Sequence, residues 1–199
     1  MNNQQFLQHL RGKLIIGVDE VGRGSWAGPL VVGAVMLDIG APIAGLGDSK
    51  LIPKQRREQL ASQITALSSA AVTGWVWPAE IDELGLTAST TLAIERAIEK
   101  INNYDHIVID GSINYLPDNA RALTCVKADS LVPAVSAASI LAKVARDNYM
   151  ADQAKQYPQY GFELHVGYGT ARHKRALVSY GVTDLHRRSF GPVRQLLSL

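Results

Sequence analysis

The 199-residue chain lacks the features of a secreted, membrane-spanning or zinc-stabilised protein. Cys125 is its only cysteine, so no disulfide can form within the chain and no cysteine-based zinc site can be built. The longest apolar run, residues 30–37, is far too short to span a bilayer. Residues 1–12 are polar and lack the apolar region of a signal peptide. We therefore expect a soluble, cytoplasmic protein.

The chain also lacks an excess of charge of one sign, because 20 Lys and Arg residues oppose 18 Asp and Glu residues for a net charge of +2. The basic residues are concentrated after Lys143, whereas several acids follow apolar segments. A basic face around an acidic centre would suit a polyanion. A solvated surface of mixed charge is the simpler interpretation of the charge pattern taken alone.

No internal repeat or low-complexity tract divides the chain, and its 47% hydrophobic content is that of a globular protein. Continuous apolar runs predict buried strands at residues 14–18, 30–37, 71–77, 106–109 and 122–126. Apolar residues at helical spacing predict helices beginning at Pro53, with Leu60, Ile64 and Leu67 on one face, and at residues 87–101, 133–156 and 170–179. This order indicates one α/β domain, residues 1–199, with a mixed sheet. Its core would cover about residues 14–156, and a C-terminal helical extension about residues 157–199.

Acidic residues follow three of the predicted strands, namely Asp19-Glu20, Asp110 and Asp129. Ligands of open α/β sheets bind outside the carboxyl ends of the strands, so these acids can converge although they are far apart in sequence. Oxygen ligands suit Mg²⁺ or Mn²⁺, and two such ions can stabilise the attacking and leaving oxygens of a phosphodiester displacement. Each acid taken alone is better explained as a turn former or helix cap, but that explanation is weaker for three strand ends together, and the metal site is therefore our hypothesis.

Adjacent acids on one strand raise a geometric problem, because neighbouring residues point to opposite faces of the sheet. Asp19 and Glu20 can serve the same ion only if the strand breaks at Glu20 or if Glu20 ligates through its carbonyl. We expect Asp19 to be the ligand that two ions share.

The turn Gly22-Arg23-Gly24 follows the first two acids directly. With Gly28 it spells a loose G-x-G-x-x-x-G pattern, which invites a dinucleotide-binding interpretation. Pro29 begins a strand where that motif requires a helix, which argues against it. The turn is better explained as backbone that approaches a nucleic-acid strand, with Arg23 as a phosphate or base-edge contact.

Short motifs along nearly the whole chain, from about Leu14 to Val193, resemble in order and spacing the signature of the ribonuclease HII family, the type 2 ribonucleases H. The motifs that carry the resemblance are Asp19-Glu20-Val21-Gly22-Arg23-Gly24, Ala27-Gly28-Pro29, Asp48-Ser49-Lys50, Asp110-Gly111, Lys127-Ala128-Asp129, residues 136–147, residues 157–162, His165, Gly167-Tyr168-Gly169-Thr170, His173 and His186-Arg187-Arg188-Ser189-Phe190. Each motif is short, but together they are specific. The resemblance implies a ribonuclease H-like fold, a mixed β-sheet flanked by helices with a C-terminal helical extension.

The resemblance also implies an activity. A member of this family would be a metal-dependent endonuclease that cleaves RNA in RNA–DNA hybrids and single ribonucleotides embedded in duplex DNA. It would cut on the 5′ side of the ribonucleotide, leave 3′-hydroxyl and 5′-phosphate ends, use two Mn²⁺ or Mg²⁺ ions, and serve ribonucleotide excision in DNA replication and repair. Two other classes remain open: a nuclease or recombinase of the same fold that acts on branched DNA, and a module that binds hybrids without cutting them.

Site residues follow from the matching positions. The resemblance places the four catalytic, metal-holding acids at Asp19, Glu20, Asp110 and Asp129. It matches Gly22, Arg23 and Gly24 to the turn that senses the 2′-hydroxyl, and Tyr168 to the tyrosine that stacks on the sugar. From the residues alone, a packed turn tyrosine is an equally good explanation of Tyr168, while reading a 2′-hydroxyl is what distinguishing RNA from DNA requires.

Basic side chains are candidates for phosphate contacts. Lys50 is one, and Lys143 and Arg146 lie three residues apart on one helix face from which they can grip the nucleic-acid backbone. The alternative for Lys143 is a surface pair with Asp147, worth a few tenths of a kcal/mol. His165 and His173 lack zinc-site spacing, and we interpret them as structural or phosphate-contacting.

Three residues depart from the family pattern. Trp26 stands where Pro-Leu is usual, Ala128 replaces a glycine, and Val166 replaces a lysine, which would remove one phosphate contact. The final residues 195–199 faintly resemble a peptide that docks on a bacterial sliding clamp, although an amphipathic end that packs on the domain is the favoured interpretation. We expect a monomer.

Overall fold

The computed structural model describes residues 2–38 and 42–197 and contains one five-stranded sheet in the order β3-β2-β1-β4-β5. Its elements are α1 (Asn3–Leu10), β1 (Ile15–Val21), β2 (Leu30–Leu37), α2 (Lys54–Leu67), β3 (Ser68–Val76), α3 (Pro78–Leu84), α4 (Leu86–Ile98), β4 (His106–Asp110), β5 (Ala122–Cys125), η1 (Ala128–Ser130), α5 (Pro133–Gln156), α6 (Phe162–His165), α7 (Ala171–Tyr180) and α8 (Gly191–Leu197). β1, β2 and β3 form an antiparallel meander, while β4 and β5 extend the sheet in parallel. The mixed sheet and the α/β class are thus confirmed.

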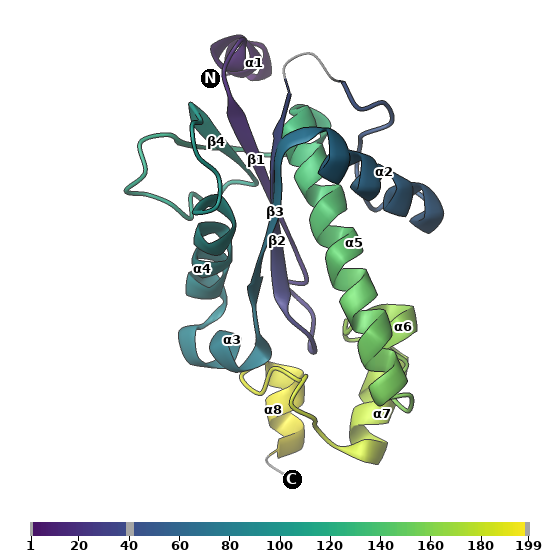
Figure 1. Ribbon diagram of the computed structural model, residues 1–199. Helices are drawn as coiled ribbons and strands as arrows, with labels where there is room; N and C mark the ends of the chain where they lie inside the picture. The colour runs from purple at the N-terminus through teal and green to yellow at the C-terminus, as the bar shows by residue number, and fades with distance from the viewer. Residues whose placement is uncertain (1, 39–41, 198–199) are drawn as a thin grey trace.

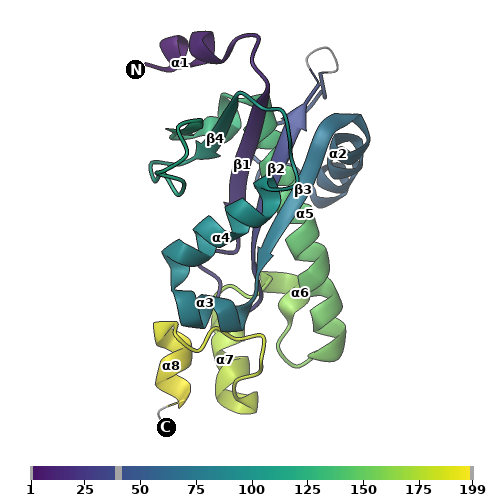
Figure 2. The same cartoon turned by 60° about the vertical axis from the view of Figure 1, so that its left-hand side comes forward.

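Helices cover both faces of this sheet. Figures 1 and 2 show α3 and α4 on one side and the long helix α5, with α2 beyond it, on the other. The core under α4 contains alternate residues of the strands, such as Ile16, Val18 and Ile107, together with Ile94 of the helix. The opposite core joins Val35 and Val108 to the alanine-rich surface of α5. Because both faces are covered, β2 and β4 are continuous apolar runs rather than alternating ones.

Helix α5 approaches β1 and β2 closely because glycines face it. A Cβ atom at Gly17 would lie 2.1 Å from the carbonyl carbon of Ala134, and one at Gly33 would lie 2.2 Å from the carbonyl oxygen of Ala138. Neither position has room for a side chain without a shift of the helix backbone. The close approach brings the first two turns of α5 directly beside the acidic end of β1.

Several boundaries differ from the prediction. The first strand does not end at Val18, because β1 stays paired with β2 as far as Val21 opposite Val31, so the first two acids lie inside the strand. Leu67, expected on the buried face of α2, is 47% exposed because the helix ends there as the chain turns into β3. Helix α3 was missed, although Pro78 at its start and Glu80, whose carboxylate accepts the Trp77 N–H at 2.9 Å, are a start signal. The 133–156 helix is confirmed.

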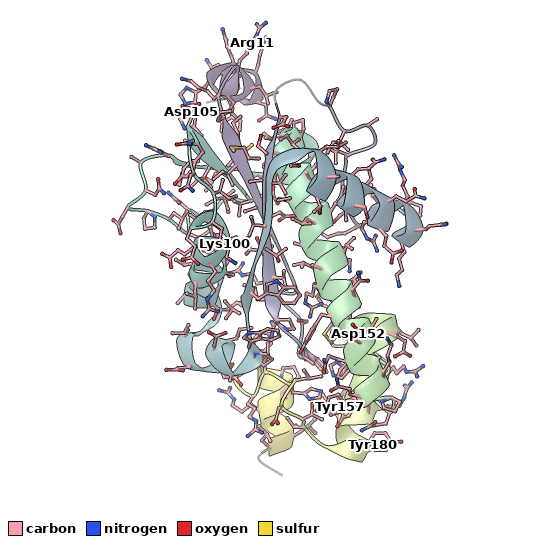
Figure 3. The ribbon with its side chains drawn as sticks, in the orientation of Figure 1. Arg11, Lys100, Asp105, Asp152, Tyr157 and Tyr180 are labelled. Carbon is pink, nitrogen blue, oxygen red and sulfur yellow. The ribbon has the colours of Figure 1, made fainter. Side chains whose placement is uncertain are left out.

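The segment after α5 folds over the far end of that helix. Figures 1 and 2 show α6, α7 and α8 together at the end of the molecule opposite α1, and Figure 3 places Tyr157 and Tyr180 there. Their common core is built on Met150, Tyr160, Phe162 and Val193. Within the described residues, no helix combines the length and hydropathy needed to cross a membrane.

Candidate active site

Asp19 and Asp110 lie side by side on parallel strands. Val18 of β1 is opposite Ile109 of β4, so the two acids are the next residues along their strands. The Asp19 side chain projects from the same face of β1 as Gly17, two residues earlier. This is the face that α5 covers. The two carboxylates therefore meet at the edge where β4 ends.

Asp129 is brought to this pair by a hydrogen bond from its own turn. The carboxylate of Asp110 accepts the backbone N–H of Ala128 at 2.7 Å, which fixes the 3₁₀ turn η1 next to β4. Ala128, where a glycine was expected, is fully buried in the core under α5. The substitution therefore leaves the turn in place.

Of the two conditions under which Glu20 could serve the same ion as Asp19, the first is not met, because β1 does not break at Glu20. Its backbone N–H donates to the carboxylate of Asp19 at 2.8 Å, and its side chain leaves the opposite face of the extended strand. Its carboxylate nevertheless feels the charge of Asp110. Glu20 thus joins the acidic group from the other side of β1.

The four acids form one electrostatic group with mutually unfavourable charges. Burial, assisted by the charges of Glu20 and Asp110, raises the pKa of Asp19 from 3.8 to about 7. Burial also raises the pKa values of Glu20 and Asp129, and the Asp110 charge adds to both shifts. Such a group is stabilised by a cation placed among the carboxylates.

An all-oxygen donor set of this kind suits a hard divalent cation. Within residues 2–38 and 42–197, no three His, Cys, Asp or Glu side chains already surround a single point as a metal cage. Asp19 and Asp110 nevertheless offer the one or two carboxylates that Mg²⁺ typically binds before water and substrate phosphate complete its shell. The donors present therefore fit the metal that the sequence predicts, without a preformed cage.

The turn Gly22-Arg23-Gly24 follows β1 and is held in a fixed shape. Ser25 closes it, because its hydroxyl donates to the carbonyl of Gly22 at 2.8 Å. The Arg23 guanidinium lies 5.8 Å from the centre of the Tyr115 ring, and Gly24 is exposed. The turn is thus exposed at Gly24, whereas Gly22 is buried and Arg23 is half-buried.

Arg146 is a structural clamp, and the expectation that it grips nucleic acid is wrong. Its side chain is fully buried and donates to the carbonyls of Ala27, Pro29 and Val166 and to the Ser25 hydroxyl, at 2.7–3.1 Å. Burial lowers the pKa of its guanidinium. The buried side chain therefore joins the glycine turn to the segment before Tyr168.

This clamp explains one glycine of the turn. A Cβ atom at Gly22 would lie 2.1 Å from Nε of Arg146. Gly22 also has a φ of 84°, which other residues rarely adopt. The position is thus restricted both by its backbone and by the arginine behind it.

Arg187 is a second clamp, which residue type and local spacing did not predict. It is fully buried and donates to the carbonyl of Gly28 at 2.9 and 3.0 Å and to the carbonyl of Arg23 at 2.9 Å. Burial, with the Arg146 charge adding, lowers the pKa of its guanidinium to about 9. The only signal in the sequence was its place within the matched His186–Phe190 motif.

Tyr168 lies next to the turn, with its side chain 38% exposed. The carbonyl of Gly167 accepts the N–H groups of Trp26 and Ala27 at 2.8 and 3.2 Å. The Trp26 ring lies where a Cβ atom at Gly169 would stand, 2.1 Å from its Cε2 atom. The tyrosine segment and the glycine turn therefore form one surface, and the unusual Trp26 is part of their contact.

The remaining candidates differ in their surroundings. Lys50 is exposed, and its charge opposes the raised pKa values of Glu20 and Asp129. Lys143 donates to Asp147 at 2.8 Å, so the alternative pair is present. Val166 adopts a left-handed conformation with φ 43°. Among these basic candidates, Lys50 is the one that lies close to the acids and is itself exposed to solvent.

The burial of His173 and His186 behind Tyr168 predicts that the folded protein becomes less stable as the pH falls. Burial lowers the pKa values of His173 and His186 from 6.5 to about 4, and the two rings are 3.1 Å apart at their Nε2 atoms. Between pH 6.5 and 4 the folded state therefore binds fewer protons than the unfolded state, and the free energy of unfolding falls as the pH falls. The loss is roughly 2–3 kcal/mol for each histidine.

The measurement is the free energy of unfolding in denaturant at several pH values from 7.5 to 4, for wild type and His186→Phe. The raised pKa of Asp19 acts in the opposite direction, so the comparison of the two slopes isolates the histidine contribution. We expect a shallower acid slope in the variant. Equal slopes would contradict the prediction.

Comparison with known proteins agrees with this geometry. The family model for ribonuclease HII matches residues 16–193. Ribonuclease HII of Albidiferax ferrireducens is 47% identical over 186 residues, which cover 92% of this chain and 89% of that protein. The family match includes both the acidic strand ends and the two arginine clamps.

Solved structures agree as well. The ribonuclease H2 of Pyrococcus horikoshii superposes with a TM-score of 0.78 at 27% identity, covering 92% of this chain and 97% of that one. The ribonuclease HII of Archaeoglobus fulgidus, solved in complex with PCNA, gives a TM-score of 0.74 at 26% identity, covering 87% and 93%. The fold is therefore ribonuclease H-like, and the chain is a nuclease that belongs to the ribonuclease HII family.

Proposed function

We propose that this protein cleaves RNA in RNA–DNA hybrids and single ribonucleotides embedded in duplex DNA, giving 3′-hydroxyl and 5′-phosphate ends. The observation that carries the proposal is that Asp19 and Asp110 continue two paired parallel strands, while Asp110 anchors the turn that bears Asp129 and the glycine turn after β1 is exposed at Gly24. A cation would stabilise carboxylates clustered in this way. The glycine turn lies where it can contact the nucleic-acid strand whose phosphate that cation would bind.

The four acids would hold Mn²⁺ or Mg²⁺, two ions with substrate bound, with Asp19 shared between them. Bound metal at this position would supply Lewis-acid stabilisation of the attacking and leaving oxygens. Asp110 additionally orients η1, and so Asp129, through its bond from Ala128. Catalysis in this proposal therefore depends on the parallel pairing of β1 with β4.

The glycine turn and Tyr168 would read the ribonucleotide. The turn Gly22-Arg23-Gly24 would approach the 2′-hydroxyl at its exposed end, Gly24, while Gly22 and the Arg23 carbonyl hold its shape, and that hydroxyl is what distinguishes RNA from DNA. The exposed Tyr168 ring lies beside the turn and would stack on the sugar. Arg146 holds these two elements together from beneath, and Arg187 fixes the turn through the carbonyls of Arg23 and Gly28.

The quaternary and cellular setting is part of the same proposal. We place the protein in the cytoplasm as a monomer of one catalytic domain, with a core of about residues 14–156 and an extension of about residues 157–199. A weaker proposal is docking of the C-terminal residues 195–199 on a sliding clamp. Leu196 packs partly on the C-terminal core and Leu197 is 49% exposed, while residues 198–199 lie outside the described part.

The experiment uses a labelled DNA duplex with one embedded ribonucleotide, a long RNA–DNA hybrid and an all-DNA duplex, each with Mg²⁺, Mn²⁺ or EDTA. We expect metal-dependent cutting on the 5′ side of the ribonucleotide and in the hybrid, and none in DNA. Cutting of branched or plain DNA would assign the protein to another nuclease class. Binding without cutting would show that the acids do not assemble with metal as proposed.

Lys50→Ala is expected to weaken substrate affinity equally across sequences and to reduce the salt dependence of affinity by about one counterion. Its exposed ammonium lies close enough to the acids to act on Glu20 and Asp129. The measurement is the slope of log affinity against log salt concentration. Lys155→Ala is the control, because Lys155 pairs with Asp152 on the surface of α5, and an identical slope in Lys50→Ala and wild type would exclude the contact.

A further inference from the structure

Three buried histidines stand behind the Tyr168 segment. His165, His173 and His186 are 7%, 0% and 1% exposed. The rings of His165 and His173 stack with centroids 4.6 Å apart and an interplanar angle of 15°, and the ring of His186 is 5.3 Å from that of His173. None of them reaches the carboxylates, so the chemistry of the acidic group does not explain them.

The hydrogen-bond partners of His186 and His173 decide which nitrogen carries each proton. Nδ1 of His186 lies 3.0 Å from the Thr183 backbone N–H, which can only donate, so Nδ1 is bare and the proton is on Nε2. The Thr183 hydroxyl is 2.9 Å from the same Nδ1 and can donate to it as well. Nε2–H of His186 then points at Nε2 of His173, 3.1 Å away.

The hydrogen bond between His173 and Tyr168, at the other end of this chain of contacts, leads independently to the same assignment. Nδ1 of His173 lies 3.0 Å from the carbonyl oxygen of Tyr168, which can only accept, so His173 carries its proton on Nδ1. Its Nε2 is therefore bare and accepts from His186. Both ends therefore require that the hydrogen bonds are donated in one direction, from Thr183 to His186, from His186 to His173, and from His173 to the Tyr168 carbonyl.

His165 braces the residue before Tyr168 in the same manner. Its Nδ1 accepts the N–H of Gly167 at 3.3 Å, and its Nε2–H donates to the carbonyl of Tyr160 at 3.0 Å. Both rings that touch the Tyr168 segment are thus neutral. Burial lowers the pKa values of all three histidines, which agrees with neutral rings at pH 7.

The Tyr168 segment needs such support because glycines flank it. Gly167 adopts a φ of 86°, and a glycine on each side allows many backbone conformations. The Tyr168 carbonyl also accepts the Thr170 N–H at 2.8 Å, so two donors fix its direction. The direction of this carbonyl fixes the peptide plane from which the exposed ring projects.

We propose that His186 and His173 are positioning residues, which form a directed chain of hydrogen bonds from Thr183 to the Tyr168 carbonyl and so hold the Tyr168 ring in its substrate-reading orientation. The proposal rests on the proposed function in that Tyr168 contacts the ribonucleotide sugar. The histidines themselves act only through Tyr168 and touch no substrate.

The first test is direct observation of the protons by NMR of protein labelled with ¹⁵N-histidine at pH 7. We expect the Nδ1–H tautomer for His173, which is the less common form of a free imidazole, and the Nε2–H tautomer for His165 and His186. A charged ring or an Nε2–H tautomer at His173 would overturn the proposal. This test needs neither substrate nor metal.

The second test asks whether the chain acts through Tyr168. His173→Leu removes the donor to the Tyr168 carbonyl, whereas His173→Asn places an amide N–H near the position of Nδ1. We expect His173→Leu to lower kcat/KM on the single-ribonucleotide duplex by about tenfold and His173→Asn to recover most of the loss. His9→Leu, an exposed histidine on α1, is the control with unchanged activity.

The decisive comparison is made in a Tyr168→Ala background. There His173→Leu should cause no further loss of kcat/KM, because the residue it positions is gone. An equal loss in both backgrounds would mean a general structural role and would overturn the proposal. If the wild type does not cut at ribonucleotides, the proposed function fails, while the tautomers and the chemical shift of the Tyr168 carbonyl carbon in His173→Leu still decide whether the chain holds this segment.

Discussion

Asp110→Asn is expected to lower turnover by at least about 10³-fold while leaving substrate affinity and the fold nearly unchanged. An asparagine oxygen can still accept the Ala128 N–H, so the η1 turn keeps its anchor. The substitution removes the charge that adds to the raised pKa values of Asp19, Glu20 and Asp129. The metal-free variant should therefore be at least as stable as wild type, and the loss should lie in catalysis. Single-turnover cleavage, equilibrium binding and thermal unfolding measure the three quantities.

Asp105→Asn is a matched control for this prediction. Asp105 also accepts one backbone N–H, that of Leu14 at 2.8 Å, but Figure 3 places it at the end of the molecule near α1. Its substitution tests the loss of a carboxylate that only accepts a backbone hydrogen bond. Normal turnover in Asp110→Asn would remove Asp110 from the metal site, and comparable losses in both variants would trace the effect to the fold.

Arg146→Leu is expected to destabilise the protein by roughly 3–5 kcal/mol, because it leaves buried acceptors without their donor. Three carbonyls and the Ser25 hydroxyl lose a partner at once, and a leucine cannot replace any of these bonds. For a chain of this size the thermal midpoint should fall by about 10 °C. Differential scanning calorimetry and denaturant unfolding provide the measurement.

The control for Arg146→Leu is Arg188→Leu. The Arg188 side chain is 58% exposed and lies 3.6 Å from Asp184, an exposed pair of little expected value. Its substitution should change the free energy of unfolding by less than about 0.5 kcal/mol. A loss below 1 kcal/mol in Arg146→Leu would mean that water or a rearranged turn replaces the arginine and would contradict the clamp.

The sequence predicted the position of the acids better than the structure of the strands that carry them. Spacing and residue type placed the acids after apolar runs, and Asp19 and Asp110 indeed lie in register at the end of β4. The end of an apolar run is not the end of strand pairing, however, and Glu20 stays paired opposite Val32 inside β1. That pairing depends on β2, which a local pattern does not describe.

Arg146 shows why its role could not be predicted from helical spacing. The spacing correctly placed it on the same helix as Lys143, but it said nothing of the loops packed over that part of α5. The partners of Arg146 are 20 to 121 residues away along the chain. A burial that depends on such distant segments is a tertiary property, whereas the pair between Lys143 and Asp147 is local and was predictable.

The Arg187 clamp has a consequence for biosynthesis. Its guanidinium bonds carbonyls that precede it by 159 and 164 residues, so the turn between β1 and β2 waits for its partner for most of translation. At typical elongation speeds this delay is roughly 10–30 s. A ribosome-bound chain can pair β1 with β2 early, but the turn Gly22-Arg23-Gly24 stays unbraced until the Arg187 segment has emerged. The bracing of this turn is thus a late step of folding, although the strands on either side of it are among the first segments made.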